Sequence, residues 1–251
     1  MGERLGDAEK RYYGRIVDLL NDREDEEEAE GTFTHNVLQQ IQADGVSRVF
    51  CDKDGSRAVE RLLQVCECDA SGLRDLIEPL ASDFRSVAED RCGSHSTEAL
   101  LKAVGRQVNG GSSDGEYKTL ETLFLQVFDN IKSSLCELLT HPYASHVVCT
   151  AVQVLSGVYV AERLTRSRYS REFRKAKLQP ESQPQTGAVV ERCVSVPQTF
   201  TTALNSLSRC VCKLENFPAL LVDARASPVL QVLLRVLTER YLNAGPRWFR
   251  E

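Results

Sequence analysis

Apolar residues recur along this 251-residue chain in short helical stripes that keep the same internal spacing. An ungapped alignment places four small residues, which we call anchors, at equivalent positions: Gly55, Gly93, Ala144 and Ala226. Nine, six and five positions before every anchor the residue is apolar, as expected for one face of a short helix. Apolar residues also stand four, seven, eight and eleven positions after each anchor, with Thr97 as the exception. The pattern predicts two amphipathic helices per unit, joined by a tight turn at the anchor.

A third apolar-periodic segment follows in three of the units, over residues 72–80, 120–131 and 200–211. Three helices that recur in this order predict an all-α solenoid, in which each unit buries its apolar face against its neighbours. The expected solenoid covers residues 8–245. We divide it into an N-terminal cap (8–45), repeat 1 (46–81), repeat 2 (82–131), repeat 3 (132–212) and a partial repeat 4 (213–243).

The spacing between anchors is uneven, and the extra residues fall in segments with a loop-like composition. Residues 108–117 are rich in Gly and Ser, and residues from about 162 to 196 form a long insertion in repeat 3. The cap combines a capping helix over residues 8–20, an acidic linker at 22–31, and a helix over 32–41 that ends a partial unit. Because repeat 4 has no third helix, we expect the chain to be part of a longer array or a shortened product.

Composition narrows the class of protein. The chain is 42% hydrophobic and 27% charged, and it has neither a signal peptide nor an apolar run of membrane-spanning length, so we expect an intracellular, soluble protein. Its nine cysteines include no Cys-x-x-Cys pair, and we expect most of them to be reduced core residues. One set of residues has side chains suited to zinc, but its spacing fits no standard motif, so we predict no metal and no cofactor: Cys136, His141, His146 and Cys149.

Charge is distributed unevenly along the chain. The formal net charge is −5, yet residues 22–30 contain seven acidic residues and one arginine. Residues 162–177 contain seven Lys or Arg against two Glu. A solvated linker is the simplest interpretation of the acidic run, whereas the basic run could contact phosphate or act as a nuclear import signal.

Polar residues also repeat after the anchors. Every unit has serine one position after its anchor: Ser56, Ser94, Ser145 and Ser227. Two positions after the anchor stand Arg57, His95, His146 and Pro228, and five positions after it stand Glu60, Glu98, Cys149 and Gln231. Helix capping would account for the serines. It would not account for a side chain able to stack beside each serine, or for Glu or Gln one helical turn later.

This triplet resembles that of the Pumilio-type RNA-binding repeats, which form right-handed solenoids and read one base of single-stranded RNA per repeat. The resemblance implies that the first and third residues contact the base edge while the second stacks on the base. It implies a guanine-type pair in Ser56 with Glu60 and in Ser94 with Glu98, and an adenine-type pair in Ser227 with Gln231. Ser145 with Cys149 matches no clear preference, and Pro228 offers a poor stacking surface.

The stretch "HPYASHVV" at 141–148 and the long insertion after the third unit make the chain most similar to the divergent nucleolar branch of the Pumilio-like family. Resemblance to that branch implies binding of small-subunit precursor rRNA during ribosome assembly, in the nucleus and nucleolus. It also implies that the chain is a monomer and that pre-ribosomal proteins are possible partners. The main alternative is an armadillo- or HEAT-like scaffold that binds peptides. We expect no enzymatic activity, because neither a convincing catalytic set nor a Walker-type phosphate loop is present.

Overall fold

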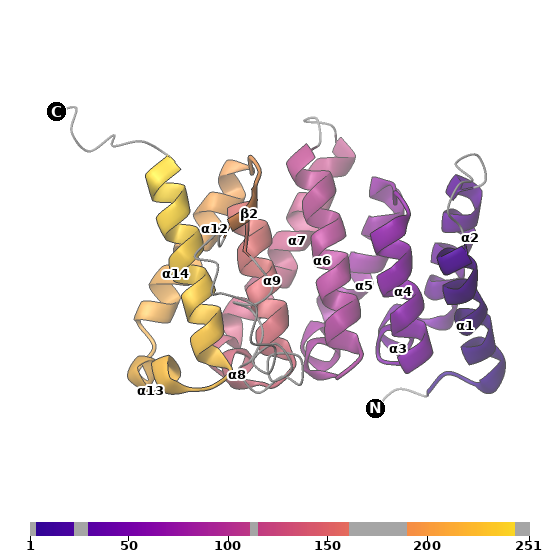
Figure 1. Ribbon diagram of the computed structural model, residues 1–251, viewed down its shortest axis with the longest axis horizontal. Coiled ribbons are helices and arrows are strands. Elements are labelled where there is room, and N and C mark those ends of the chain that lie inside the picture. Colours follow the sequence, from indigo (N-terminus) through magenta and orange to yellow (C-terminus); the bar gives the residue numbers. More distant parts are fainter. Residues whose placement is uncertain (1–3, 23–29, 111–114, 161–189, 244–251) are drawn as a thin grey trace, which may run out of the picture. The chain divides into compact units, whose positions relative to one another are not determined.

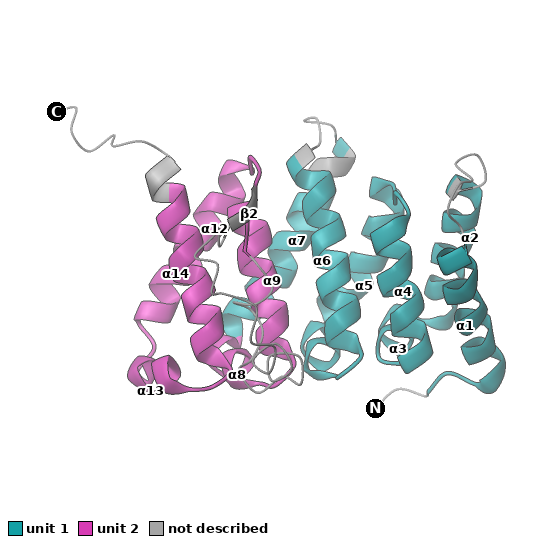
Figure 2. Cartoon of the chain, in the orientation of Figure 1, with its two compact units in different colours: residues 1–133 teal, residues 134–251 magenta. Residues whose placement is uncertain are grey.

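The computed structural model describes residues 4–22, 30–110, 115–160 and 190–243. Most of the acidic run, and the basic run within the predicted insertion, lie outside these ranges. The chain divides into two compact units, residues 1–133 and residues 134–251 (Figure 2). Within the described ranges, no helix is both long and apolar enough to cross a membrane.

Unit 1 consists of helices arranged in two rows. Its helices are α1 (Asp7–Asp22), α2 (Glu30–Asp44), α3 (Val46–Phe50), α4 (Lys53–Val65), α5 (Ala70–Glu89), α6 (Gly93–Gly110) and α7 (Gly115–Ser133). In one row α1 packs against α4 and α4 packs against α6 (Figure 1). In the other row α2 packs against α5 and α5 packs against α7.

Unit 2 repeats this plan and adds a short β-ribbon. Its elements are α8 (Leu135–Thr140), α9 (Ala144–Ser156), β1 (Val158–Val160), β2 (Val190–Cys193), α12 (Gln198–Cys212), α13 (Phe217–Val222) and α14 (Ala226–Asn243). Both α12 and α14 pack against α9. The two strands pair antiparallel, with Val158 opposite Cys193 and Tyr159 opposite Arg192.

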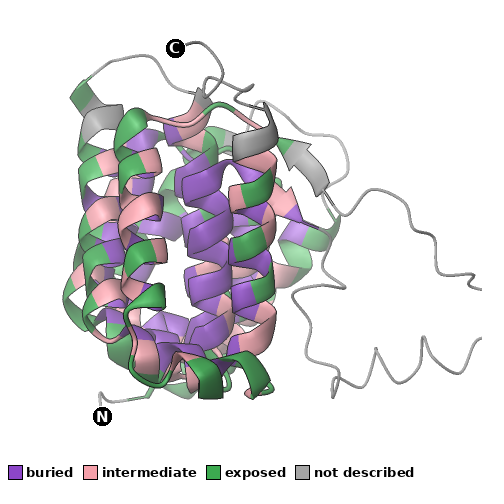
Figure 3. Ribbon diagram, turned by 90° about the vertical axis from the view of Figure 1, so that its left-hand side faces the viewer, coloured by how far each residue is buried: buried purple, intermediate pink, exposed green. Residues whose placement is uncertain are grey.

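The core consists of the apolar stripes that the sequence repeats. Four positions after the anchors, Val59, Val148 and Leu230 are all buried, and so is Thr97. Thr97 is tolerated there because its hydroxyl donates to the carbonyl of Gly93 at 2.7 Å. Buried positions lie on the helix surfaces that face neighbouring helices, and exposed positions face outward (Figure 3).

The all-α class and the helices that begin near each anchor are confirmed, but two local predictions were wrong. Residues 72–80 and the first helix of repeat 2 form one continuous helix, α5, which includes Pro79. Pro79 is exposed, so solvent can hydrate the carbonyl that lacks its usual N–H donor. The loop predicted at 108–117 is shorter, since α6 extends to residue 110 and α7 begins at residue 115.

The C-terminal part of the insertion predicted at about 162–196 holds a strand that the sequence analysis did not predict. This strand, β2, pairs with β1 just before the insertion. Ser156 and Gln153 at the end of α9 secure this pairing, because the Ser156 hydroxyl accepts from the N–H of Val158 at 3.0 Å. The Gln153 side-chain oxygen accepts from the N–H of Val160, also at 3.0 Å. A three-residue strand is too short to show a period of two in the sequence.

One part of the predicted core is exposed. Leu221 and Leu234 occupy stripe positions five before and eight after the fourth anchor, but they are 50% and 67% exposed. In repeats 1 to 3 both positions are buried. No described helix covers this side of α13 and α14.

Candidate nucleic-acid interface

An aspartate closes the turn before three of the four anchors. The Asp52 carboxylate accepts from the backbone N–H groups of Asp54 and Gly55 at 2.9 and 3.2 Å. Equivalent bonds are made three residues before the other anchors by Asp90, His141 and Asp223. These side chains cap the second helix of each unit. The suggestion that the serines cap these helices was therefore wrong, because the acceptor that the free N–H groups need lies further upstream.

In repeats 1 and 4, the serine that follows the anchor faces the residue one helical turn later. The Ser56 hydroxyl donates to Glu60 Oε1 at 3.2 Å, and the Gln231 amide donates to the Ser227 hydroxyl at 3.1 Å. Each pair therefore presents two neighbouring polar groups from one helix turn. In repeat 2 the Ser94 hydroxyl donates instead to the carbonyl of Arg91 at 3.2 Å.

Burial separates the three kinds of triplet position. The serines of repeats 1 to 3 are buried. The middle residues Arg57 and His95 are exposed, and the third residues Glu60 and Glu98 are half-buried. This arrangement holds the serine still while the middle residue extends into solvent. In unit 1, α4 and α6 are neighbours, so Arg57 and His95 lie on adjacent helices. Packed helices are about 8–10 Å apart. A flat ring stacked between two such side chains needs about 3.5 Å on each side.

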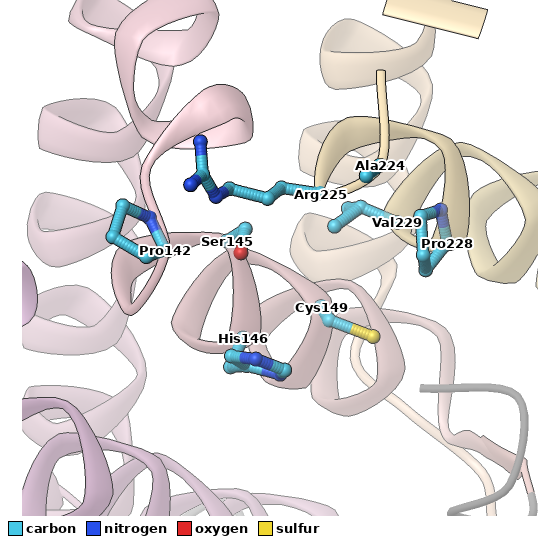
Figure 4. Close-up of a pocket in the computed structure, with 8 residues that line it drawn as sticks. All are labelled: Pro142, Ser145, His146, Cys149, Ala224, Arg225, Pro228 and Val229. Carbon is cyan, nitrogen blue, oxygen red and sulfur yellow. The ribbon is translucent and has the colours of Figure 1, made fainter. Parts of the chain in front are cut away.

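Unit 2 has a cavity of about 180 Å³ where α9 and α14 begin (Figure 4). An apolar cavity of about 150 Å³ can hold a benzene ring, so this one has room for a six-membered ring. It is lined by three predicted site residues, Ser145, His146 and Cys149, together with Pro142, Ala224, Arg225, Pro228 and Val229. The structure therefore brings the third triplet together with the middle residue of the fourth.

Cys149 differs from its counterparts because it is only 3% exposed. The amide of buried Gln153 lies 3.8 Å from its sulfur, on the next helical turn. Only a small part of this thiol can reach the cavity wall, so repeat 3 presents little polar surface to a base edge.

Arg225 is a cavity residue that sequence reasoning missed. It stands one position before the anchor, where the other units have Asp54, Cys92 and Tyr143, so no repeated pattern pointed to it. Its side chain extends past Ser145 toward Pro142, and its guanidinium donates to the carbonyl of Thr140 at 3.3 Å (Figure 4). Arg225 therefore places a cation on the wall of this cavity.

Three of the four side chains considered for zinc, those of Cys136, His141 and Cys149, have other contacts. His141 caps α9, and Cys136 Sγ accepts from the Asn216 amide at 2.9 Å. Across the described residues, no group of three or more His, Cys, Asp or Glu side chains could hold a metal ion. That zinc is absent from the whole chain stays a prediction.

Two thiols lie near the anchor turns of unit 1. Burial, with a smaller contribution from Asp90, raises the pKa of Cys51 to about 12. Burial also raises the pKa of Cys92. Both thiols therefore remain protonated at neutral pH, and they add no negative charge beside the predicted base-contacting residues.

A family model described as the NOP9-like PUF repeat domain matches residues 47–245. Curated relatives include nucleolar protein 9 of Homo sapiens, 26% identical over 90% of this chain, and nucleolar protein 9 of Fusarium vanettenii, 26% identical over 96%. Pumilio homolog 23 of Arabidopsis thaliana is 25% identical over 92%. The matches cover 35%, 34% and 30% of these proteins, so the chain spans about a third of their length.

Solved structures agree on the fold. The chain resembles a structure described as APUM23-GGAAUUGACGG with a TM-score of 0.68 and 23% sequence identity, over 96% of this chain and 42% of that one. A structure described as APUM23-GGAGUUGACGG gives a TM-score of 0.67 at 23% identity, over the same shares of both chains. The predicted resemblance to Pumilio-like repeats is confirmed.

Proposed function

We propose that this chain, which belongs to the NOP9-like PUF repeat domain family, binds single-stranded RNA and reads one base with each of its repeats. The observation that carries the proposal is the serine paired with Glu or Gln one turn later, beside a side chain that can stack. The Ser56 hydroxyl lies 3.2 Å from the Glu60 carboxylate, and the Ser227 hydroxyl lies 3.1 Å from the Gln231 amide. Each pair can therefore present a single recognition surface. A peptide-binding scaffold requires no such pairing.

Hydrogen-bond chemistry gives each pair a preference. A carboxylate only accepts hydrogen bonds, so Glu60 and Glu98 suit the Watson–Crick N–H groups of guanine. The Gln231 amide can both donate and accept, as an adenine edge requires. Arg57, His95 and His146 can stack on any base, which adds affinity without selectivity. In chain order, the four repeats then prefer guanine, guanine, an unspecified base and adenine.

The RNA sequences of the APUM23 structures support an order of reading. Three structures carry GGAAUUGACGG, GGAGUUGACGG and GGAUUUGACGG, which all end in ACGG. Read from the 3′ end, ACGG is guanine, guanine, cytosine, adenine, which matches the preferences of repeats 1 to 4. Read from the 5′ end, the fourth base varies among the three RNAs. We therefore propose that repeat 1 binds the 3′-most base of ACGG.

The names of the relatives suggest a biological setting. The human and fungal relatives are both named nucleolar protein 9. We accordingly propose small-subunit precursor rRNA as the RNA, in the nucleus and nucleolus, with the chain acting as a monomer and not as an enzyme. Crosslinking in cells followed by sequencing of the bound RNA tests this part, and recovery of messenger RNA alone would contradict it.

The biochemical test compares GGAAUUGACGG with versions in which each of the last two guanines is replaced by adenine. We expect wild type to prefer the original RNA, and the double variant Glu60→Gln, Glu98→Gln to lose that preference at a cost of about 1–3 kcal/mol per base. Glu78→Gln is the matched control, because Glu78 is an exposed carboxylate on α5. Unchanged preference in a folded double variant would refute base reading, and binding of peptides but not RNA would favour the armadillo- or HEAT-like alternative.

A further inference from the structure

Within unit 1, helix α1 occupies the place that the second helix of a repeat would take. It packs against α4 as α4 packs against α6 (Figure 1). Helix α2 packs against α5 as α5 packs against α7. The N-terminal cap therefore resembles a partial repeat. It contributes a second and a third helix, and the described residues contain no first helix for it.

The buried residues of α1 fix its register against the repeats. Tyr13, Ile16 and Leu20 are buried and Val17 is half-buried. These four positions match the stripe four, seven, eight and eleven residues after an anchor if the anchor is residue 9. In repeat 1 the same stripe contains Val59, Leu62, Leu63 and Cys66, all of them buried.

Glu9 at this anchor position ties α1 to repeat 1. Its carboxylate lies 2.9 Å from the Arg48 guanidinium of α3. Tyr13 adds a second tie, because its hydroxyl donates to Asp44 at 2.7 Å at the end of α2. The register of α1 is thus held by polar contacts as well as by the apolar stripe.

This register assigns a triplet to the cap. Lys10 takes the serine position, Arg11 the stacking position and Gly14 the position of Glu60. Arg11 is exposed, as Arg57 and His95 are, and its Nε donates to the carbonyl of Asp7 at 3.2 Å. A Cβ added to Gly14 would meet no atom within 4 Å, so the space that Glu60 fills in α4 is open in α1.

We propose that α1 holds one further nucleotide, whose base stacks between Arg11 and Arg57 and is accepted whatever its identity. The proposal rests on the proposed RNA binding. Two guanidinium planes on neighbouring helices provide stacking surfaces for any base. Gly14 offers no side chain to discriminate the base edge.

The experiment measures the affinity of GGAAUUGACGG against the same RNA with one nucleotide added at its 3′ end or at its 5′ end. We expect an addition at the 3′ end, beside the base proposed for repeat 1, to raise affinity about five- to hundredfold, by similar factors for all four bases. Arg11→Ala should bind the extended and unextended RNAs alike. Arg85→Ala is the matched control, because Arg85 is an exposed arginine on α5, outside the row of α1, α4 and α6.

A second variant tests the register by adding selectivity. Lys10→Ser combined with Gly14→Glu should make the added position prefer guanine by about tenfold, because it copies the pair of Ser56 and Glu60. If neither end shows a gain that depends on Arg11, while GGAAUUGACGG still binds, the cap site is refuted and the proposed function stands. If no RNA binds to any folded variant, the proposed function itself fails.

Discussion

Aspartates at the anchor turns link local helix stability to the proposed interface. Asp52 accepts two backbone N–H groups at the start of α4, and Ser56, Arg57 and Glu60 follow within the next two turns. Without this cap the first turn of α4 would lose the partners of those N–H groups. The residues proposed to contact RNA would then lie on a fraying helix end.

Asp52→Ala is therefore expected to lower the free energy of unfolding by about 1 kcal/mol. Urea unfolding followed by circular dichroism measures this loss, and Asp52→Asn should recover most of it because asparagine is an equally good cap. Glu78→Ala serves as the control, since Glu78 is exposed in the interior of α5. A loss in Asp52→Ala no larger than in Glu78→Ala would contradict the capping role.

The triplets show where sequence reasoning succeeds at the scale of single residues. Ser56 with Glu60 and Ser227 with Gln231 were found from spacing alone, because residues four apart on a helix must be neighbours. The burial of Cys149 was not foreseen, since it depends on the packing of α9 against both α12 and α14. The role of these residues in base reading stays a prediction.

At the scale of elements, the anchor glycines set how closely the two helices of a unit approach. A Cβ on Gly93 would lie 2.4 Å from the carbonyl oxygen of Val87 and 2.9 Å from its Cγ1. Gly55 is equally close to Val49. Repeats 3 and 4 have alanine at the anchor position, so their first two helices accommodate the extra methyl group.

Gly93→Ala should consequently destabilise the chain by about 1–3 kcal/mol through overpacking. Gly14→Ala should instead stabilise it by up to about 1 kcal/mol, because it removes a glycine from a helix interior where nothing obstructs a Cβ. Urea unfolding of both variants provides the comparison. Equal effects of the same sign would contradict the difference in space around the two glycines.

The apolar stripes predicted most helices because burial on one face must repeat every 3.6 residues. They missed the join within α5, where the stripe of residues 72–80 runs on to Phe84 and Val87 without a residue that ends the helix. They also did not reveal α1 as a unit, because Lys10, Arg11 and Gly14 replace the polar signature. The stripe of Tyr13, Ile16, Val17 and Leu20 was the signal that could have found it.

At the scale of the whole chain, the order of the recognition pairs should determine the direction in which RNA is read. Glu60 belongs to repeat 1 and Gln231 to repeat 4, so they lie near opposite ends of the repeat array in sequence. Changing each into the other's residue type alters one base preference and keeps side-chain size. The position in the RNA at which each preference changes then identifies the base that each repeat contacts.

Glu60→Gln is expected to shift the preferred 3′ sequence from ACGG to ACGA, because glutamine suits an adenine edge. Gln231→Glu is expected to shift it from ACGG to GCGG. Each change should alter relative affinity by about 1–3 kcal/mol at one position and leave the others within experimental error. Competition binding against all single-base variants of GGAAUUGACGG measures both shifts. Shifts at the first and fourth bases from the 5′ end would reverse the proposed direction, because repeat 1 would then contact the 5′ guanine.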